Sequence, residues 1–188
     1  MAKMIGKTNL AEYQNHNYQP GANWLKRILW FYISAIIFKT SFFPSSGFKV
    51  FLLRMFGSKI GKNVVVRHRL NIKFPWFLTV GDFSWIGEEV WIDNLVPVKF
   101  GANVCLSQGA VLLTGNHNYS KKNFDLITGG IFLANGVWIG AKAIVCPNVY
   151  ADEHAVLAAG SIATKNMEAY FVYQGNPAVK VRKRQIED

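Results

Sequence analysis

Four histidines are the side chains of this 188-residue chain best suited to proton transfer near neutral pH: His16, His68, His117 and His154. Imidazole has an unperturbed pKa of about 6.5, so it can take the proton of a hydroxyl while that oxygen attacks another group. Three converging imidazoles could instead hold a zinc ion with an open fourth position. The four histidines are far apart in the sequence and form no paired motif, so we predict no metal site.

Most of the chain follows a six-residue repeat, which sets where these side chains stand. From Leu133 to Glu168, one repeated position holds Leu133, Ile139, Val145, Ala151, Leu157 and Ala163, and small or apolar residues recur four residues later. A helix would repeat at three and four residues and a free strand at two. A period of six predicts short strands joined by regular turns and stacked as a solenoid, in which each coil buries its apolar side against its neighbours.

One long excursion interrupts the repeat. The same six-residue spacing runs from residue 60 to residue 112, except at two places where two extra residues are inserted. The next step is much longer, because Leu112 and Leu133 are 21 residues apart instead of six. About residues 114–131 are therefore expected to leave the solenoid as a loop. A long loop in a regular scaffold is usually functional or disordered.

Of the four histidines, only His117 stands at the root of this loop. His16 lies in a polar N-terminal stretch and His154 in a regular turn, where solvated side chains are expected. His68 occupies a position in the first coil and is expected to be structural. An isolated loop histidine would also be expected to be solvated, so residue type alone does not give His117 a role.

Composition limits the classes of partner. At 51% hydrophobic, the chain is long enough for one sizeable core and short for two domains. Its formal charge of +10 favours a polyanionic partner: nucleic acid, an anionic membrane or a phosphate-rich cofactor. Nucleic acid is not expected, because no binding motif accompanies the charge. Cys105 and Cys146 lie within repeats, which favours small core residues and a reducing cytoplasm.

The first 57 residues differ from the rest. Residues 1–23 are polar, do not resemble a secretion signal and are expected to form an arm with little structure of its own. Residues 24–56 are rich in large apolar side chains, but their longest uncharged piece, Ile28–Phe38, is about half of what spans a bilayer. They are expected either to form two short helices that cap the solenoid or to lie on a membrane surface. We therefore divide the chain into an arm and helical cap, 1–57, and a solenoid with a basic tail, 58–188.

Several segments resemble a known family. The repeats GVWIGAKAIV and AVLAAGSIAT, the loop opening TGNH and the closing GNPAVKVRKR resemble the left-handed β-helix, or hexapeptide-repeat, acyltransferases that use acetyl-CoA. With VWIDNLVPV, SQGAVLLTGNHNYS and FDLITGGI, the chain is most similar to the colanic acid biosynthesis acetyltransferases. The resemblance implies a mainly β fold: a left-handed parallel β-helix with short N-terminal helices and one extruded loop. The handedness opposes the usual rule for parallel strands and comes from the resemblance alone.

The same resemblance implies roles for particular residues. His117 matches the histidine that acts as general base. Asn94 matches a substrate-contacting asparagine and its neighbour Asp93 could be the polar contact instead, although both residue types also simply favour turns. The positions that match the acyl-CoA groove are Trp138, Gly140, Ala141, Ala159, Gly160, Thr164 and Lys165. The basic tail after Pro177 could contact the phosphates of coenzyme A.

These matches imply an acetyl-CoA-dependent O-acetyltransferase that modifies a sugar or a lipid-linked saccharide in exopolysaccharide biosynthesis. The family resemblance further implies a homotrimer with active sites between subunits, located in the cytoplasm or at the inner face of the membrane. Three alternatives stay open: an acetyltransferase for another small acceptor, a zinc enzyme built on His68, His117 and His154, and a non-catalytic scaffold or membrane-binding module.

Overall fold

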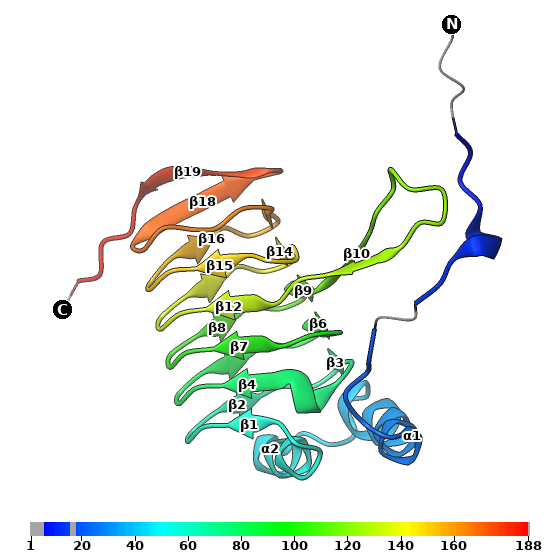
Figure 1. The fold of residues 1–188 in the computed structure, drawn as a ribbon. Coiled ribbons are helices and arrows are strands. Elements are labelled where there is room, and N and C mark those ends of the chain that lie inside the picture. Colours follow the sequence, from blue (N-terminus) through cyan, green and yellow to red (C-terminus); the bar gives the residue numbers. More distant parts are fainter. Residues whose placement is uncertain (1–5, 16–17, 188) are drawn as a thin grey trace, which may run out of the picture.

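A computed structural model describes residues 6–15 and 18–187 of the chain, so His16 lies outside the described residues. Within them, three sheets wrap around one core and their strands stack along a single axis (Figure 1); neighbouring strands of these sheets are parallel except β18 and β19. Sheet A contains β1 (Lys59–Ile60), β4 (Leu78–Val80), β7 (Val98–Phe100), β12 (Ile131–Leu133) and β15 (Tyr150–Ala151). Sheet B contains β2 (Val65–Val66), β5 (Trp85–Ile86), β8 (Cys105–Leu106), β13 (Trp138–Ile139), β16 (Val156–Leu157), β18 (Phe171–Gly175) and β19 (Ala178–Lys183). Sheet C contains β3 (Asn71–Ile72), β6 (Trp91–Asp93), β9 (Val111–Leu113), β14 (Ile144–Val145) and β17 (Ile162–Ala163).

The predicted inner positions form the core. In sheet B, Ile86 pairs with Leu106, and Ile139 pairs with Leu106 and Leu157, so equivalent apolar residues of successive coils stack on one another. All fifteen repeat positions predicted to face inward between residues 60 and 163 are at most 9% exposed. The solenoid prediction is therefore confirmed, and each coil buries its apolar side against the next.

The irregularities of the repeat all fall at one corner of the prism, where the chain passes from sheet C to sheet A. We call this the C–A corner. The two slips lie there, one as the short 3-10 helix η3 (Pro75–Phe77) and one as residues 94–97. The long excursion leaves at the same corner, after β9, and returns at β12. The residues that exceed the six-residue repeat therefore all lie along one edge of an otherwise regular solenoid.

The excursion is a β-hairpin. Its strands β10 (Gly115–His117) and β11 (Leu126–Thr128) are antiparallel, with His117 opposite Leu126. Figure 1 shows the hairpin projecting sideways from the stack of coils. The predicted loop at about 114–131 therefore has a defined structure of its own.

Helices cover the end of the solenoid at β1. They are α1 (Trp24–Ile33), the π-helical segment η2 (Ser34–Phe38) and α2 (Ser46–Met55), and Asn23 and Ser45 cap the two α-helices. The Trp30 indole N–H donates to the carbonyl oxygen of Ile72 at 2.9 Å, which ties α1 to the first coil. The fully buried Lys49 amine donates to the carbonyl oxygen of Arg67 at 2.7 Å and does the same for α2. Among the described residues, no helix has the length and apolarity that crossing a bilayer requires.

Candidate functional site

His117 stands on the hairpin with one face of its ring covered. Its ring stacks on the ring of Phe124 with centroids 4.5 Å apart, and its Nδ1 lies 2.9 Å from the Phe124 carbonyl oxygen. A carbonyl oxygen can only accept a hydrogen bond, so Nδ1 carries the proton and the neutral ring keeps its lone pair on Nε2. The hairpin therefore holds His117 in the tautomer that can accept a proton at Nε2, as a general base must.

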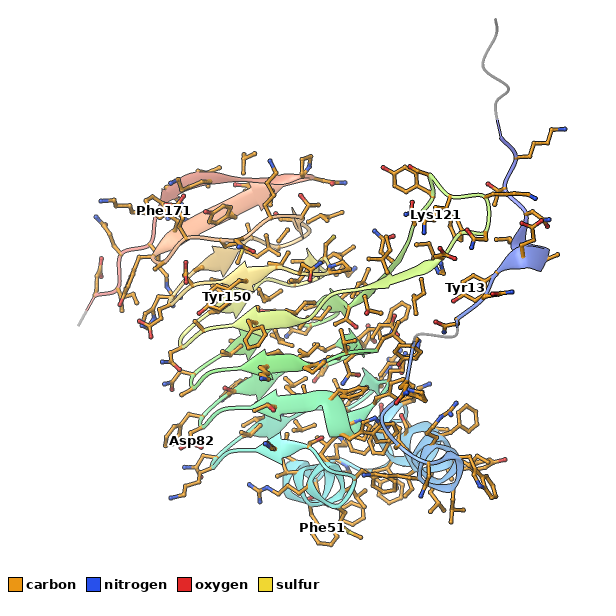
Figure 2. The ribbon with its side chains drawn as sticks, in the orientation of Figure 1. Tyr13, Phe51, Asp82, Lys121, Tyr150 and Phe171 are labelled. Carbon is orange, nitrogen blue, oxygen red and sulfur yellow. The ribbon has the colours of Figure 1, made fainter. Side chains whose placement is uncertain are left out.

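The N-terminal arm lies against the hairpin. The backbone N–H of Asn9 donates to the backbone carbonyl oxygen of Lys122 at 2.8 Å, and the side-chain amine of Lys122 pairs with the carboxylate of Glu12. The Tyr13 ring, which Figure 2 shows on the arm beside the hairpin, lies 5.9 Å from the His117 ring. The sequence predicted an arm with little structure, and among residues 6–15 and 18–23 one 3-10 turn forms, η1 (Leu10–Glu12). Its contact with the hairpin has no periodic signal in the sequence.

Tyr18 fastens the arm to the C–A corner. Its hydroxyl donates to the carbonyl oxygen of Leu95 at 3.0 Å. Burial, and after it the nearby Asp93 carboxylate, raises the pKa of Tyr18 to about 12. The hydroxyl therefore stays protonated, and remains a donor, throughout the neutral range.

A cavity of about 600 Å³ lies between the arm and the hairpin. Amide, hydroxyl and charged side chains dominate its lining, and Lys121 and Asp125 form an ion pair of 3.1 Å across part of it. Asn118, the residue after His117, contributes to the wall. The full lining is Gln14, Asn15, Tyr18, Gln19, Val96, Asn118, Lys121, Asn123, Asp125, Leu126, Ile127 and Thr128. Such a set of donors and acceptors suits a ligand with many hydroxyls.

The structure separates the two residues proposed for substrate contact. Asn94 is fully buried, and its side-chain amide accepts from the Phe74 N–H at 2.9 Å and donates to the Phe74 carbonyl at 2.6 Å. The Asn94 amide therefore holds the corner of the preceding coil, and the expected substrate contact of Asn94 stays a prediction. Asp93 is partly exposed and lies 2.9 Å from the Lys73 amine, so it remains the candidate contact.

The residues matched to the cofactor groove divide between two corners. Trp138 is exposed on sheet B, with its indole N–H donating to Ser107, and Ala141, Ala159 and Gly160 follow sheet B strands at the corner leading to sheet C. Thr164 and Lys165 follow β17 at the C–A corner. There they line a hollow of about 300 Å³ together with Pro177 and Lys180 of the tail hairpin.

Gly140 is the exception within this group, because it is buried. A Cβ at this position would lie 2.5 Å from the backbone nitrogen of Ala159 in the next coil, far inside a van der Waals contact. The absence of a side chain at Gly140 therefore lets two coils approach closely, and its expected place in the groove stays a prediction.

The remaining described histidines lie apart from His117. His68 lies 3.7 Å from Glu88 in the first coils, and the His154 ring packs on Tyr170, with centroids 4.8 Å apart. His154 is therefore half-covered, whereas a solvated side chain was expected. In the described residues, no group of three or more histidine, cysteine and acidic side chains could hold a metal ion.

Solved structures of hexapeptide-repeat acetyltransferases share this fold of short parallel strands on three faces of one prism. A crystal structure of a hexapeptide-repeat acetyltransferase, VCA0836 from Vibrio cholerae, with acetyl-coenzyme A has a TM-score of 0.76 and 21% identity, covering 86% of this chain and 88% of that one. Galactoside acetyltransferase in complex with coenzyme A gives a TM-score of 0.74 at 23% identity, covering 86% and 82%. No model of a protein family matches the chain.

Sequence comparison gives a more similar relative. The chain is 37% identical over 164 residues to the Escherichia coli protein named "Putative colanic acid biosynthesis acetyltransferase WcaF", covering 87% of this chain and 90% of that protein. Galactoside O-acetyltransferase of the same organism is 26% identical over 134 residues. The chain therefore belongs to the left-handed β-helix acetyltransferases, in the family that includes WcaF.

Proposed function

We propose that this protein is an acetyl-CoA-dependent O-acetyltransferase that acts on a hydroxyl of a carbohydrate, with His117 as general base. The observation that carries the proposal is the 2.9 Å contact between His117 Nδ1 and the Phe124 carbonyl oxygen, which leaves Nε2 free to accept a proton. As the acceptor oxygen attacks the acetyl carbonyl, its proton passes to Nε2, so that no alkoxide has to form free in water.

The cavity between the arm and the hairpin is the proposed acceptor site. Its amides, hydroxyls and charged pair can exchange hydrogen bonds with a sugar, and the Asp93 carboxylate is near enough to one lining residue, Tyr18, to contribute to the rise in its pKa. Since a relative that is 37% identical is named for colanic acid biosynthesis, the acceptor we propose is a sugar residue of an exopolysaccharide or of its lipid-linked precursor.

The proposed acetyl-CoA groove follows Trp138, Ala141, Ala159 and Gly160. Ala159 and Gly160 are exposed, and a Cβ built on Gly160 would meet nothing within 4 Å, so an extended pantetheine arm would have room beside the backbone. Thr164, Lys165 and Lys180 lie around the hollow beside the tail, where the cations suit the phosphates of coenzyme A.

A homotrimer would complete this site. The hairpin leaves sheet C at its C–A corner, whereas Ala141, Ala159 and Gly160 stand at the opposite end of the sheet C strands. The outward side of sheet C between them carries the partly exposed ladder Val111, Ile144 and Ile162. We propose that this apolar face packs on a second copy, which brings the His117 of one subunit to the groove of the next.

We also propose a cytoplasmic location at the inner face of the membrane. Residues 1–57 would then form an arm and cap that bring the catalytic unit, 58–188, to a lipid-linked acceptor. The amphipathic character of the cap supports this arrangement, since its exposed apolar residues have basic neighbours.

The test is acetyl transfer by the purified protein. Acetyl-CoA is offered with a panel of sugars and one amine-containing analogue of each, and release of the free thiol of coenzyme A is followed. An O-acetyl product is cleaved by mild hydroxylamine, whereas an N-acetyl product resists it. Light scattering gives the mass in solution. No acetyl-CoA binding would contradict the proposed activity, and a stable, active monomer would contradict the shared site.

A further inference from the structure

The base of the solenoid, formed by α1, η2 and α2, carries an unusual surface. A set of large apolar residues there are each between 37% and 86% exposed: Trp24, Leu25, Ile28, Leu29, Phe31, Tyr32, Ile36, Phe42, Phe43, Phe48, Phe51 and Met55. Figure 2 shows Phe51 on the underside of α2, pointing away from the coils. Scattered apolar residues are normal on a protein surface, but a set this dense on two short helices marks an interaction site.

The charge of this region is one-sided. From Tyr13 to Gly81 the sequence holds ten lysines and arginines and no aspartate or glutamate. Some of these cations meet acids of the second coil, as Arg67 does with Glu88. Among the described residues, Lys26, Arg27 and Lys39 form no ion pair. Apolar side chains beside unpaired cations complement an anionic membrane surface, where each cation is attracted to lipid phosphates.

A pocket of about 580 Å³ opens at this base, between α1, η2 and the first coil. Its walls combine the cations Arg27, Lys39 and Lys73 with apolar and aromatic side chains such as Ile28 and Phe31. Of these cations, Lys73 also contacts Asp93, at 2.9 Å. An amphiphile needs this combination: cations for an anionic head group and apolar walls for the start of a hydrocarbon tail.

Ser34 supplies an independent observation. It lines the pocket, it is 4% exposed, and its hydroxyl has no hydrogen-bond partner among the described residues. A buried hydroxyl without a partner is unfavourable, so a hydrogen-bond acceptor that reached Ser34 from the pocket would satisfy it. Ser34 begins the π-helical segment η2, and π-helical turns occur frequently at functional sites.

We propose that this pocket binds the phosphate of a membrane lipid while the base of the solenoid rests on an anionic leaflet. Arg27 and Lys39 contact the phosphate, Ser34 donates to one of its oxygens, and the exposed side chains of α1 and α2 enter the outer part of the hydrocarbon. The proposal deepens the membrane contact proposed above by naming the ligand and its residues. Because α1 has ten residues, it lies along the surface and does not cross it.

The test is sedimentation of the full-length protein with vesicles, without acetyl-CoA or acceptor. One set is phosphatidylcholine, the second contains phosphatidic acid, and the third contains oleic acid at equal surface charge. The protein should bind the phosphatidic acid vesicles most tightly. Added inorganic phosphate at the same phosphate concentration should not release it. Equal binding to the second and third sets, or release by inorganic phosphate, would overturn the assignment of a lipid phosphate.

Two variants separate the pocket from general charge attraction. Arg27→Gln with Lys39→Gln removes two cations, each of which adds on the order of fivefold to binding at an anionic surface, so partitioning should fall roughly 25-fold. The matched control, Arg182→Gln with Lys183→Gln, removes two cations from β19 at the other end of the solenoid and should change it little. If both pairs lose binding equally, the base is not the docking surface.

Ser34→Ala tests the phosphate contact itself. Binding to phosphatidic acid vesicles should fall on the order of tenfold, as expected for a lost hydrogen bond to a charged group. The melting temperature of the free protein should not fall, since the hydroxyl has no partner in the described structure. Undiminished vesicle binding by a folded Ser34→Ala protein would overturn the pocket assignment. Acetyl transfer to a soluble acceptor is measured separately, so loss of vesicle binding leaves the proposed activity independently testable.

Discussion

Replacing His117 by alanine removes the proposed base and little else. General-base catalysis contributes typically about 10²- to 10⁴-fold to the rate. At about 1.36 kcal/mol per factor of ten, kcat should therefore fall by the equivalent of about 2.7 to 5.4 kcal/mol.

The structural cost of His117→Ala should be small by comparison. The variant loses one hydrogen bond, of about 0.5–1.5 kcal/mol, and one ring stack of similar size. For a chain of this length, each kcal/mol shifts the melting temperature by about 2–4 °C. Since the hairpin projects from the solenoid, opening it exposes none of the core, and we expect a shift at the low end of that range.

Turnover is measured with saturating acetyl-CoA, and acetyl-CoA binding is measured separately by calorimetry. His68→Ala is the matched control, because that histidine lies near Glu88 in the first coils and should keep full activity. Phe124→Leu keeps the backbone carbonyl that selects the tautomer and removes only the stacked ring, so its loss of turnover should be far smaller. A folded His117→Ala protein that binds acetyl-CoA and retains turnover within a fewfold of the parent would refute the reasoning.

Three further predictions concern the groove, the arm and the thiols. Ala159→Trp should raise KM for acetyl-CoA at nearly constant melting temperature, because the residue is exposed; an unchanged KM in steady-state assays would place the cofactor elsewhere. Tyr18→Phe removes the 3.0 Å bond to Leu95 and should speed proteolysis of the arm and raise KM for the acceptor, whereas unaltered cleavage and KM would show that the arm is not fixed there. Burial raises the pKa of Cys105 and Cys146. A raised folded-state pKa favours the protonated thiol. This contribution to stability is therefore complete below the thiol pKa of the unfolded state and is lost as pH rises through the thiol pKa of the folded state. Alkylation at pH 8 should be slower in the native protein than in urea, and equal rates would contradict the burial.

The sequence predicted the solenoid well because its determinants are local and periodic. Residues such as Leu106 and Ile139 repeat the same step along the chain, and stacking follows directly when each coil has equal length. The position of the hairpin could be predicted for the same reason, since 21 residues cannot fit where six are needed.

The burial of Asn94 and Gly140 could not be predicted in the same way. Both residues match family positions, but their environment depends on the neighbouring coil: Asn94 on the backbone of Phe74 and Gly140 on the backbone of Ala159. A six-residue repeat predicts which side chains of a strand face the core, but it does not predict how much of a turn residue the next coil buries. The contact of Tyr13 with His117 is equally invisible, because it joins an aperiodic arm to a hairpin more than a hundred residues away.

The C–A corner gives a physical reason why the proposed general base lies where the six-residue repeat is interrupted. A coil can take up extra residues only at a corner, since an insertion within a strand would break the ladder to both neighbours. Here the insertions of successive coils support each other: Asn94 holds Phe74, and the buried Thr114 hydroxyl donates to the Asp93 carbonyl and accepts from the Leu95 amide, both at 2.8 Å. The strands that begin and end the hairpin therefore start from ordered turns, which hold the position of His117 along an otherwise irregular edge.

The opposite corner of sheet C, which leads from sheet B, has no room for extra residues. Between β13 and β14 the coils are in tight contact, and Gly140 leaves no room there even for a methyl group. A narrow corner suits an extended cofactor along the backbone but cannot carry a hairpin, so the proposed general base and the proposed groove lie at different edges of one prism. In the trimer we propose, a second copy of the chain would bring these two edges together, and the proposed activity would then depend on assembly.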